Sequence, residues 1–393
     1  MSYHLLKISC LALAVGGIVL LKGCTDDEEM IIQQPMVTAS QTVSINPVAE
    51  GLNVPWSMVD LPDTRHLLVA EKTGDFVRLD ADSGKIIQRY SLPAASSNFV
   101  VTGQGGLLDI VLTKDFSDSG VFYYSHAAEN EAGDYTTQVV RAQLTDTTIT
   151  NAQVIFVAQP YLSKSHHFGS RLVIHDGYLF VAVGDRGNRD LAQSLTTHNG
   201  KIMRLNLDGS VPDDNPFVNQ ADARPEIWSY GHRNIQGMKV NPADNKLWAH
   251  EHGPQGGDEL NIIQPGRNYG WPVITYGKEY VTGFSIGEGT SKPGMEQPVK
   301  YYVPSIAPSG LIFYDGQRFP EWQGDALIGA LKLTHINRVS LDEGKAVNEE
   351  RLFDDQNPRV RALLHTQDDR IFFSTDTGRI FEIMPANTDL AYQ

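Results

Sequence analysis

The body of this chain contains no cysteine: Cys10 and Cys24 are its two cysteines, so no disulfide can form within the sequence that follows them. Basic residues are also scarce, and 32 Lys and Arg against 47 Asp and Glu give a net charge of −15. That balance argues against a nucleic-acid binder, which needs a basic face to neutralise phosphates. Only one long apolar run occurs, and at 41% hydrophobic and 20% charged residues the chain is neither disordered nor a multi-span membrane protein.

The long apolar run lies at the N-terminus and is typical of an export signal. Residues 8–21 form 14 uncharged residues behind Lys7, which is short for a membrane-spanning helix and suitable for a signal peptide. The run leads into a Leu-Lys-Gly-Cys sequence ending at Cys24, which resembles a bacterial lipoprotein box although a lysine is unusual inside it. We expect residues 1–23 to be a lipoprotein-type signal peptide, and an uncleaved anchor or simple secretion are the alternatives. Residues 24–42 then form an acidic and polar tether, and the working part is periplasmic and reaches the membrane only through a lipid anchor.

From about residue 40 the sequence repeats a pattern of apolar β-run, turn and β-run, with little helical periodicity. Six such units occur, at residues 67–79, 121–142, 178–205, 246–263, 326–341 and 370–383. The pattern predicts an all-β, six-bladed β-propeller over residues 43–385, with a large Greek-key sandwich as the alternative. Residues 43–45 are expected to close the ring on the last blade, and residues 386–393 form a C-terminal tail. The long loops 184–200, 206–226, 251–275 and 277–310 are expected to carry the function.

Two adjacent histidines, His166 and His167, precede the third unit. A histidine at a strand entrance can act as a general base, because its unperturbed pKa lies near neutrality. Neighbouring side chains of a strand face opposite ways, so only one of the two can point into a pocket. Surface polar residues or an adventitious metal site are the alternatives.

A glycine cluster, Gly103-Gln104-Gly105-Gly106, leads into another apolar run. It lacks the following helix that a dinucleotide-binding or phosphate-binding loop requires. The functional interpretation makes the Gln104 amide a hydrogen-bonding arm at the rim of a pocket. The alternative is a tight turn between blades.

Several cationic side chains recur at the ends of β-runs. Arg233 and Asn234 stand side by side between glycines, a pair that can clamp a carboxylate or a quinone oxygen, or form an ion pair between blades. Arg359 and Arg361 alternate and so share one strand face, and Lys332 follows the first β-run of the fifth unit. Each cation alone is ordinarily solvated, and they can converge on one axis only if an anionic ligand offsets their repulsion.

Residues 250–259 carry two histidines and three acids around a Gly-Pro turn. Zinc sites of this composition usually take two histidines from one helical turn, and this glycine-rich stretch does not favour a helix. Carboxylates with exposed carbonyls suit a hard cation, so calcium is the better interpretation. A purely structural loop is the alternative.

Taken together and in order, these segments resemble the glucose/sorbosone dehydrogenase family, and in particular its soluble aldose sugar dehydrogenases that use pyrroloquinoline quinone. The segments that carry the resemblance are Gly-Gln-Gly-Gly, His-Phe-Gly-Ser-Arg, Tyr-Gly-His-Arg-Asn-Ile-Gln-Gly, Glu-His-Gly-Pro-Gln-Gly-Gly-Asp-Glu and Asn-Tyr-Gly-Trp-Pro. The resemblance covers about residues 43–385, nearly the whole exported chain. The family fold is a six-bladed propeller, which agrees with the six units.

The resemblance implies roles for thirteen residues. It makes His167, the position before Phe-Gly, the general base, although the doubled histidine leaves His166 as an alternative. It implies contacts to the cofactor or the reacting centre from Gln104, Arg233, Asn234, Tyr280, Lys332, Arg359 and Arg361. It implies calcium at the cofactor, held by the carbonyls of Gly253 and Pro254, and a second, structural calcium near Asp258, Glu259 and Tyr269.

The reaction implied is oxidation of the anomeric hydroxyl of an aldose to a lactone, with hydride transfer to the quinone. Two alternatives are a calcium-dependent propeller lactonase and a non-catalytic propeller that binds glycan or protein. The expected partners are a small aldose and an electron acceptor that the sequence does not identify, with no nucleic acid. The chain is expected to be a monomer or a dimer.

Overall fold

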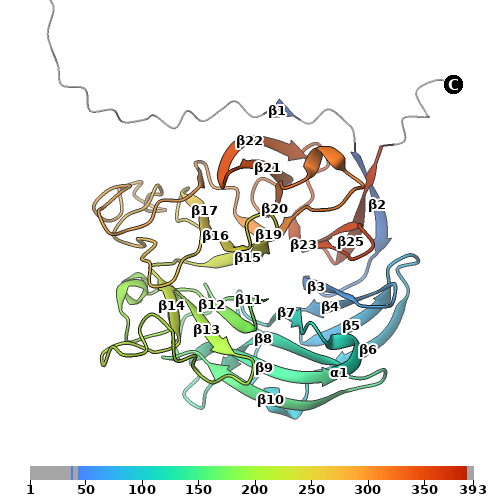
Figure 1. The fold of residues 1–393 in the computed structure, drawn as a ribbon, viewed down its shortest axis with the longest axis horizontal. Coiled ribbons are helices and arrows are strands. Elements are labelled where there is room, and N and C mark those ends of the chain that lie inside the picture. The colour runs from blue at the N-terminus through green and yellow to red at the C-terminus, as the bar shows by residue number, and fades with distance from the viewer. Residues whose placement is uncertain (1–36, 39–42, 387–393) are drawn as a thin grey trace, which may run out of the picture. The chain divides into compact units, whose positions relative to one another are not determined.

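The computed structural model describes residues 37–38 and 43–386. These residues form six β-sheets that follow one another around a ring in sequence order (Figure 1). Each sheet is an antiparallel meander whose first strand lies nearest the centre of the ring. The predicted six-bladed propeller is therefore confirmed, and the sandwich alternative is wrong.

The strands of the first three blades alternate in direction from the centre outwards. The first blade contains β3 (Pro55–Leu61), β4 (His66–Glu71), β5 (Asp75–Asp80) and β6 (Ile86–Ser91). The second contains β7 (Leu107–Leu112), β8 (Val121–Glu129), β9 (Tyr135–Leu144) and β10 (Ile149–Val157). The third contains β11 (Gly169–His175), β12 (Tyr178–Val183), β13 (Lys201–Asn206) and β14 (Ile227–Tyr230).

The last three blades follow the same plan with two additions. The fourth contains β15 (Ile235–Asn241), β16 (Lys246–Glu251), β17 (Asp258–Ile262) and β18 (Lys300–Tyr302). The fifth contains β19 (Pro308–Phe313), β20 (Ala326–Ala330), β21 (Ile336–Asp342) and β22 (Lys345–Leu352), and β1 (Val37–Thr38) pairs with β22 in parallel. The sixth contains β23 (Val360–His365), β24 (Ile371–Thr375), β25 (Arg379–Pro385) and, as its outer strand, β2 (Val43–Ala49).

Helical structure in the described ranges is confined to short connecting turns. They are α1 (Phe116–Ser119) and the 3₁₀ turns η1 (Ala94–Ser96), η2 (Arg189–Gln193) and η3 (Pro320–Trp322). No helix in the described part of the chain has the length and apolar character needed to cross a bilayer. The predicted signal peptide, Cys24, most of the tether and residues 387–393 lie outside the described residues.

The hydrophobic core is divided among the seams between blades. Successive side chains of a strand point to opposite faces, so Leu68 of β4 packs with Phe122 of the second blade, while Leu67 packs with Phe372 of the sixth. All four side chains are buried. Burying one such side chain stabilises a fold by about 1.5–3 kcal/mol. The middle strands of each blade are therefore apolar on both faces.

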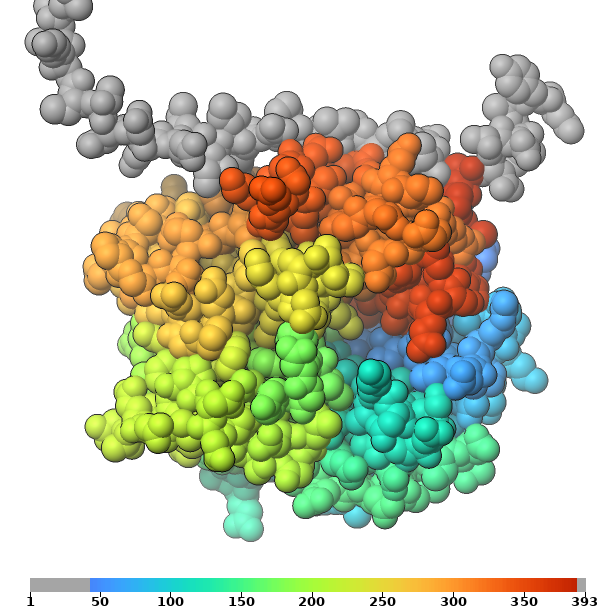
Figure 2. Space-filling model, in the orientation of Figure 1, coloured from blue at the N-terminus to red at the C-terminus, as the bar shows by residue number. Residues whose placement is uncertain are grey.

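The ring is closed by strand β2, as predicted for residues 43–45. Strand β2 pairs antiparallel with β25, with Ile45 opposite Ile383. The last blade also packs against the first, and Figure 2 shows their red and blue surfaces side by side. Closure removes most free sheet edges and fixes the six inner strands around one axis.

Candidate active site

The loop that carries His167 enters β11 in a constrained conformation. His167 has φ of 56°, in the left-handed region that a residue with a side chain seldom adopts, and Gly169 has φ of 64°. Side chains from two other blades hold this turn. Gln104 Oε1 accepts the backbone N–H of His167 at 2.8 Å, and Asn234 Oδ1 accepts that of Gly169 at 3.2 Å. From the same blade, Arg186 Nη1 donates to the carbonyl oxygen of His166 at 2.7 Å, so the orientation of His167 is fixed from several sides.

The imidazole of His167 is paired with a buried carboxylate. Its Nδ1 lies 2.7 Å from Asp185 Oδ1, and 13% of the His167 side chain is exposed. Asp185 also accepts the backbone N–H of Gly187 at 2.7 Å and the indole N–H of Trp271 at 2.8 Å. Because an ionised carboxylate can only accept hydrogen bonds, Nδ1 carries the proton and Nε2 keeps a free lone pair.

The electrostatics of this pair favour a neutral imidazole and a charged carboxylate. Burial lowers the pKa of His167, Asp185 opposes that shift, and the positive charge of Arg233 adds to it. Burial alone raises the pKa of Asp185, but the hydrogen bond and charge of His167 and the charge of Arg233 outweigh it and leave that pKa low. At neutral pH the site therefore presents an unprotonated Nε2 that can accept a proton.

The neighbouring histidine is held differently. The His166 ring stands edge-on to the His167 ring, with 4.6 Å between centroids. The Nε2 atom of His166 packs against Gly187 so closely that a Cβ atom on residue 187 would lie 2.2 Å from it. Within the described ranges His166 has no carboxylate partner comparable to Asp185. The contacts of His167 thus match those of a general base better than the contacts of His166 do.

A cavity of about 370 Å³ lies where the inner strands converge. Four residues predicted to bind the cofactor line it: Gln104, Asn234, Arg359 and Arg361. Three further lining residues were not singled out from the sequence: Trp56, Lys72 and Asp376. The structure therefore brings together side chains from positions 56 to 376, contributed by the first, second, fourth and sixth blades.

The wall of this cavity carries more positive than negative charge. Arg359 and Arg361 share one carboxylate: each donates from Nε to Asp376, at 2.7 Å in both cases. Lys72 donates to the carbonyl oxygen of Gly103 at 2.6 Å, and burial and the charge of Arg361 lower the Lys72 pKa. Three cations against one carboxylate leave an excess positive charge that suits an anionic ligand.

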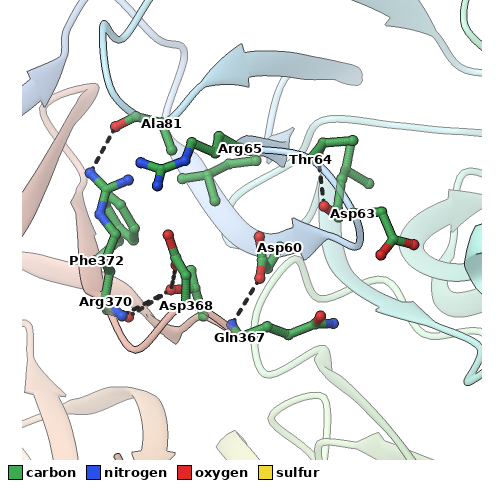
Figure 3. Close-up of a pocket in the computed structure, with 12 residues that line it drawn as sticks. Asp60, Asp63, Thr64, Arg65, Ala81, Gln367, Asp368, Arg370 and Phe372 are labelled. Atoms are coloured by element: carbon green, nitrogen blue, oxygen red, sulfur yellow. Dashed lines mark hydrogen bonds between the residues drawn. The ribbon is translucent and has the colours of Figure 1, made fainter. Parts of the chain in front are cut away.

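A second cavity, of about 450 Å³, lies at the opposite end of β3 and differs in charge (Figure 3). It is lined by Asp60, Asp63 and Asp368, and Asp60 accepts the backbone N–H of Gln367 at 2.9 Å. The lining guanidinium of Arg370 is already engaged by Glu382, Asp82 and the carbonyl oxygen of Ala81. The acidic surplus makes this cavity unsuitable for an anionic cofactor.

Three of the seven predicted cofactor contacts, Lys332, Tyr280 and Arg233, do not line the 370 Å³ cavity. Lys332 is exposed and follows Leu331, which does line the cavity. Tyr280 is 64% exposed in the loop after β17. Their roles stay predictions.

Arg233 lies beside His167 rather than in the wall of the cavity. It is buried, and its guanidinium donates to the carbonyl oxygen of His252 at 3.0 Å and lies over the Trp271 ring at 5.4 Å.

The predicted calcium segment is tightly hydrogen-bonded around Asp258. Its carboxylate accepts the backbone N–H groups of Gly253 at 2.9 Å, Ile306 at 2.9 Å and Ala307 at 3.0 Å. Asp258 therefore orders the loop that presents Gly253 and Pro254. Within the described residues no group of three or more His, Cys, Asp or Glu side chains is arranged to hold a metal, so any metal here depends on backbone oxygens as well.

A small cavity of about 10 Å³ beside this loop fits a hard cation. Glu251, Glu259, Tyr269 and Thr275 line it, together with the backbone of Gly253. Glu259 keeps some exposed surface, yet protein surrounds it so closely that burial, with the charge of Glu251, raises its pKa to about 8. Glu251 is already bonded to His232 and the Arg233 backbone. The Tyr269 hydroxyl is already used, since it donates to the carbonyl oxygen of Ile262 at 2.6 Å and accepts the N–H of Gln264 at 2.9 Å. Calcium prefers an under-compensated carboxylate among oxygen donors, so Glu259, Thr275 and the backbone oxygens are the groups that fit the predicted second calcium.

The residues that sequence reasoning missed are those whose roles depend on tertiary contacts. Asp185 and Trp271 lie in two loops that were expected to be functional, 184–200 and 251–275, but nothing in the sequence pairs them. Lys72 ends a buried strand next to a turn and contacts Gly103, which is 31 residues away. Their position at the ends of apolar runs is the signal that could have indicated them.

The fold is a six-bladed propeller with a histidine–carboxylate pair beside a cationic cavity, an arrangement typical of a propeller that binds an anionic ligand. Residues 52–382 match the family model described as Glucose / Sorbosone dehydrogenase. The chain belongs to that family.

Individual relatives agree with this assignment. The aldose sugar dehydrogenase YliI of Escherichia coli is 39% identical over 356 residues, which cover 89% of this chain and 95% of the relative. The crystal structure of the soluble E. coli aldose sugar dehydrogenase in its apo form superposes with a TM-score of 0.84 at 38% identity, covering 88% of this chain and 100% of that one. The PQQ-bound aldose sugar dehydrogenase of Streptomyces coelicolor gives 0.71 at 25% identity, covering 87% and 98%.

Proposed function

We propose that this protein oxidises the anomeric hydroxyl of aldoses to lactones, with pyrroloquinoline quinone bound in the 370 Å³ cavity. The E. coli relative is an aldose sugar dehydrogenase, and the Streptomyces structure is described as a PQQ-bound form. The observation that carries the proposal is the histidine–carboxylate pair beside a cavity with an excess of cations: Asp185 binds His167 Nδ1 at 2.7 Å and leaves Nε2 free to accept a proton. A base next to an anion-binding cavity supports oxidation of a hydroxyl by a negatively charged cofactor.

The cofactor is a tricarboxylate, and the cavity offers matching charge. Lys72, Arg359 and Arg361 are its cationic lining groups, and Asp376 offsets part of their mutual repulsion when the cavity is empty of ligand. Gln104 uses its Oε1 on His167, so its amide N–H groups remain available to an acceptor in the cavity. The flat indole of Trp56 supplies an apolar surface.

The chain's own groups manage the proton. When bound, the quinone supplies the hydride-accepting chemistry. His167 Nε2 takes the proton of the anomeric hydroxyl as the C1–H bond is broken, and Asp185 stabilises the imidazolium that results. Arg233, buried beside this pair, favours negative charge developing on the reacting oxygen. The protonated His167 then returns its proton to solvent.

Calcium completes the proposal. Gly253 and Pro254 do not line the 370 Å³ cavity, but the neighbouring His252 does, so their carbonyl oxygens would hold one ion at the edge of the cofactor. Glu259 with the Tyr269 region would hold a second, structural ion. The first would polarise the acceptor, and the second would relieve the unfavourable burial of Glu259.

Reconstitution tests the proposed activity. The purified protein is loaded with pyrroloquinoline quinone and calcium, and the quinone spectrum is followed as aldoses are added. Bleaching that requires an aldose, with lactone as product, supports the proposal. A lactonase or a non-catalytic glycan-binding propeller would leave the spectrum unchanged, and that result would exclude the dehydrogenase.

We further propose that the protein is a periplasmic lipoprotein anchored through Cys24, with the signal peptide removed. The 24–42 tether would then link the lipid to a propeller that has no other membrane contact. Replacing Cys24 by Ser should move the protein from the membrane fraction to the soluble fraction. Retention in the membrane fraction would exclude this mode of anchoring.

A further inference from the structure

The most exposed large apolar side chains of the described residues gather on one hairpin. Val281 is 97% exposed, Phe284 72% and Tyr280 64%, whereas no other large apolar side chain there exceeds 49%. They belong to the loop after β17, which forms part of the orange lobe at the left edge of Figure 2. A soluble protein seldom leaves an aromatic pair and a valine together in water unless a partner covers them.

The hairpin is ordered rather than loose. Lys278 and Ser285 form an antiparallel bridge, the N–H of Glu279 donates to the carbonyl oxygen of Phe284 at 2.9 Å, and that of Gly283 to Glu279 at 3.0 Å. Its base pairs with Gln255, whose N–H donates to the carbonyl oxygen of Lys278 at 3.0 Å. The apolar tip is therefore presented in one conformation, which lowers the entropic cost of binding.

Short contacts connect the hairpin to the candidate active site. Arg189 Nη1 binds Glu279 Oε1 at 2.6 Å, and the same guanidinium lies 5.7 Å from the centroid of the Trp271 ring. Trp271 in turn donates to Asp185, the partner of His167. The base of the hairpin is thus linked through Arg189 to the Trp271 side of the candidate site, and a protein seated on the tip would approach the molecule on that side.

The proposed reaction requires an electron acceptor, and the present inference rests on that proposed function. Oxidation of one aldose to its lactone releases two electrons and two protons. The electrons stay on the cofactor until an acceptor removes them, and the protons pass to solvent. Two molecules of a one-electron carrier, each reduced once, restore the oxidised enzyme.

We propose that Tyr280, Val281 and Phe284 form the docking surface for a basic redox protein that reoxidises the enzyme. The net charge of −15 attracts a cationic partner over long range. Small, largely apolar contacts of limited area are typical of the transient complexes in which electrons are passed. Hot-spot residues of such contacts are commonly aromatic, as two of these three are.

The test compares two electron acceptors in steady-state turnover of the reconstituted enzyme with glucose. One is a basic c-type cytochrome at low salt, and the other is a small dye such as phenazine methosulfate. The variant carries Val281→Ser and Phe284→Ser. Its matched control carries Ile86→Ser and Ile87→Ser, two exposed residues of β6 in the first blade. We expect the variant to lose about tenfold in kcat/KM for the cytochrome, equivalent to ~1.4 kcal/mol, while its dye-coupled rate and both rates of the control stay at the wild-type level.

Other outcomes overturn the inference. If the wild-type enzyme reduces the dye but not the cytochrome, it does not pass electrons to a basic redox protein, and the proposal is wrong. Equal losses with both acceptors place the defect in catalysis, and a change from dimer to monomer on gel filtration makes the tip a self-association surface. If no aldose reduces even the dye through the wild type, the proposed function itself has failed, and the docking surface fails with it.

Discussion

Trp271 donates its indole N–H to Asp185 Oδ2 at 2.8 Å, although 86 residues separate them and they belong to loops of different blades. The other oxygen of the same carboxylate binds His167 Nδ1. The indole therefore fixes the carboxylate that fixes the imidazole. This chain of contacts links the long loop after β17 to His167, the proposed general base.

Replacing Trp271 by Phe should weaken catalysis while the site still binds its cofactor. Phenylalanine keeps an aromatic ring at position 271 but removes the indole N–H that Asp185 accepts. Without this hydrogen bond the Asp185 carboxylate is more basic, so it stabilises the protonated imidazole of His167 more strongly. We expect kcat to fall about tenfold and the acid limb of the pH–rate profile to move to higher pH. Trp228→Phe, in β14, is the matched control and should leave the profile unchanged. An unshifted profile in the Trp271 variant would remove the indole from this role.

Replacing Asp185 by Asn should shift the profile the opposite way. Burial lowers the pKa of His167, and Asp185 is the group that opposes this shift. Without the carboxylate the pKa of His167 falls further, so the acid limb moves to lower pH. The amide also fails to stabilise the imidazolium, and kcat should fall by ~10²–10⁴. A variant that keeps the wild-type rate would show that the pair is structural only.

The proposed structural calcium site predicts an affinity that depends on pH through Glu259. Its pKa is raised to about 8, so at pH 7 the ion must displace a proton, and the affinity should rise with pH and level off above about 8. We expect calcium to raise the Tm of the wild type and to leave that of Glu259→Gln unchanged. The exposed Glu288→Gln variant should respond like the wild type. A pH-independent affinity measured by calorimetry would argue against Glu259 as a ligand.

Lys72 should contribute to cofactor affinity. It is one of three cations lining the 370 Å³ cavity, and its pKa is lowered because it is partly buried and close to Arg361. Lys72→Met should weaken binding of the quinone about tenfold, or ~1.4 kcal/mol, and reduce the salt dependence of that binding. The exposed Lys85→Met is the control. Unchanged affinity in a fluorescence-quenching titration would exclude Lys72 from the site.

The sequence was most informative about the middle strands of each blade. The six units found in it are β4–β5, β8–β9, β12–β13, β16–β17, β20–β21 and β24–β25, each of which lies between two other strands of its sheet. These strands are buried on both faces, as Leu67 and Leu68 illustrate, and so read as continuous apolar runs. The inner and outer strands mix polar residues with apolar ones, as in the Ile86–Ser91 strand, and few of them were recognised. The ring-closing run at residues 43–45, which is part of the outer strand β2, is an exception.

The site was predictable where its residues fall in compact motifs and not where they meet through the fold. Gln104, Asn234, Arg359 and Arg361 were assigned from short segments and line one cavity. Asp185 was missed because its pairing with His167 depends on a left-handed turn at φ 56°, which the sequence does not reveal. The aromatic tip at Phe284 was missed because exposure is a property of the folded surface.

The central claim is that His167 removes the proton from a sugar bound beside a quinone. Stopped-flow reduction of the reconstituted enzyme by glucose, run for wild type and His167→Gln at equal cofactor saturation, tests it most directly. We expect the rate constant for reduction to fall at least ~10²-fold while the Kd for the cofactor stays the same. A loss of less than about tenfold in that rate constant would show that another group is the base.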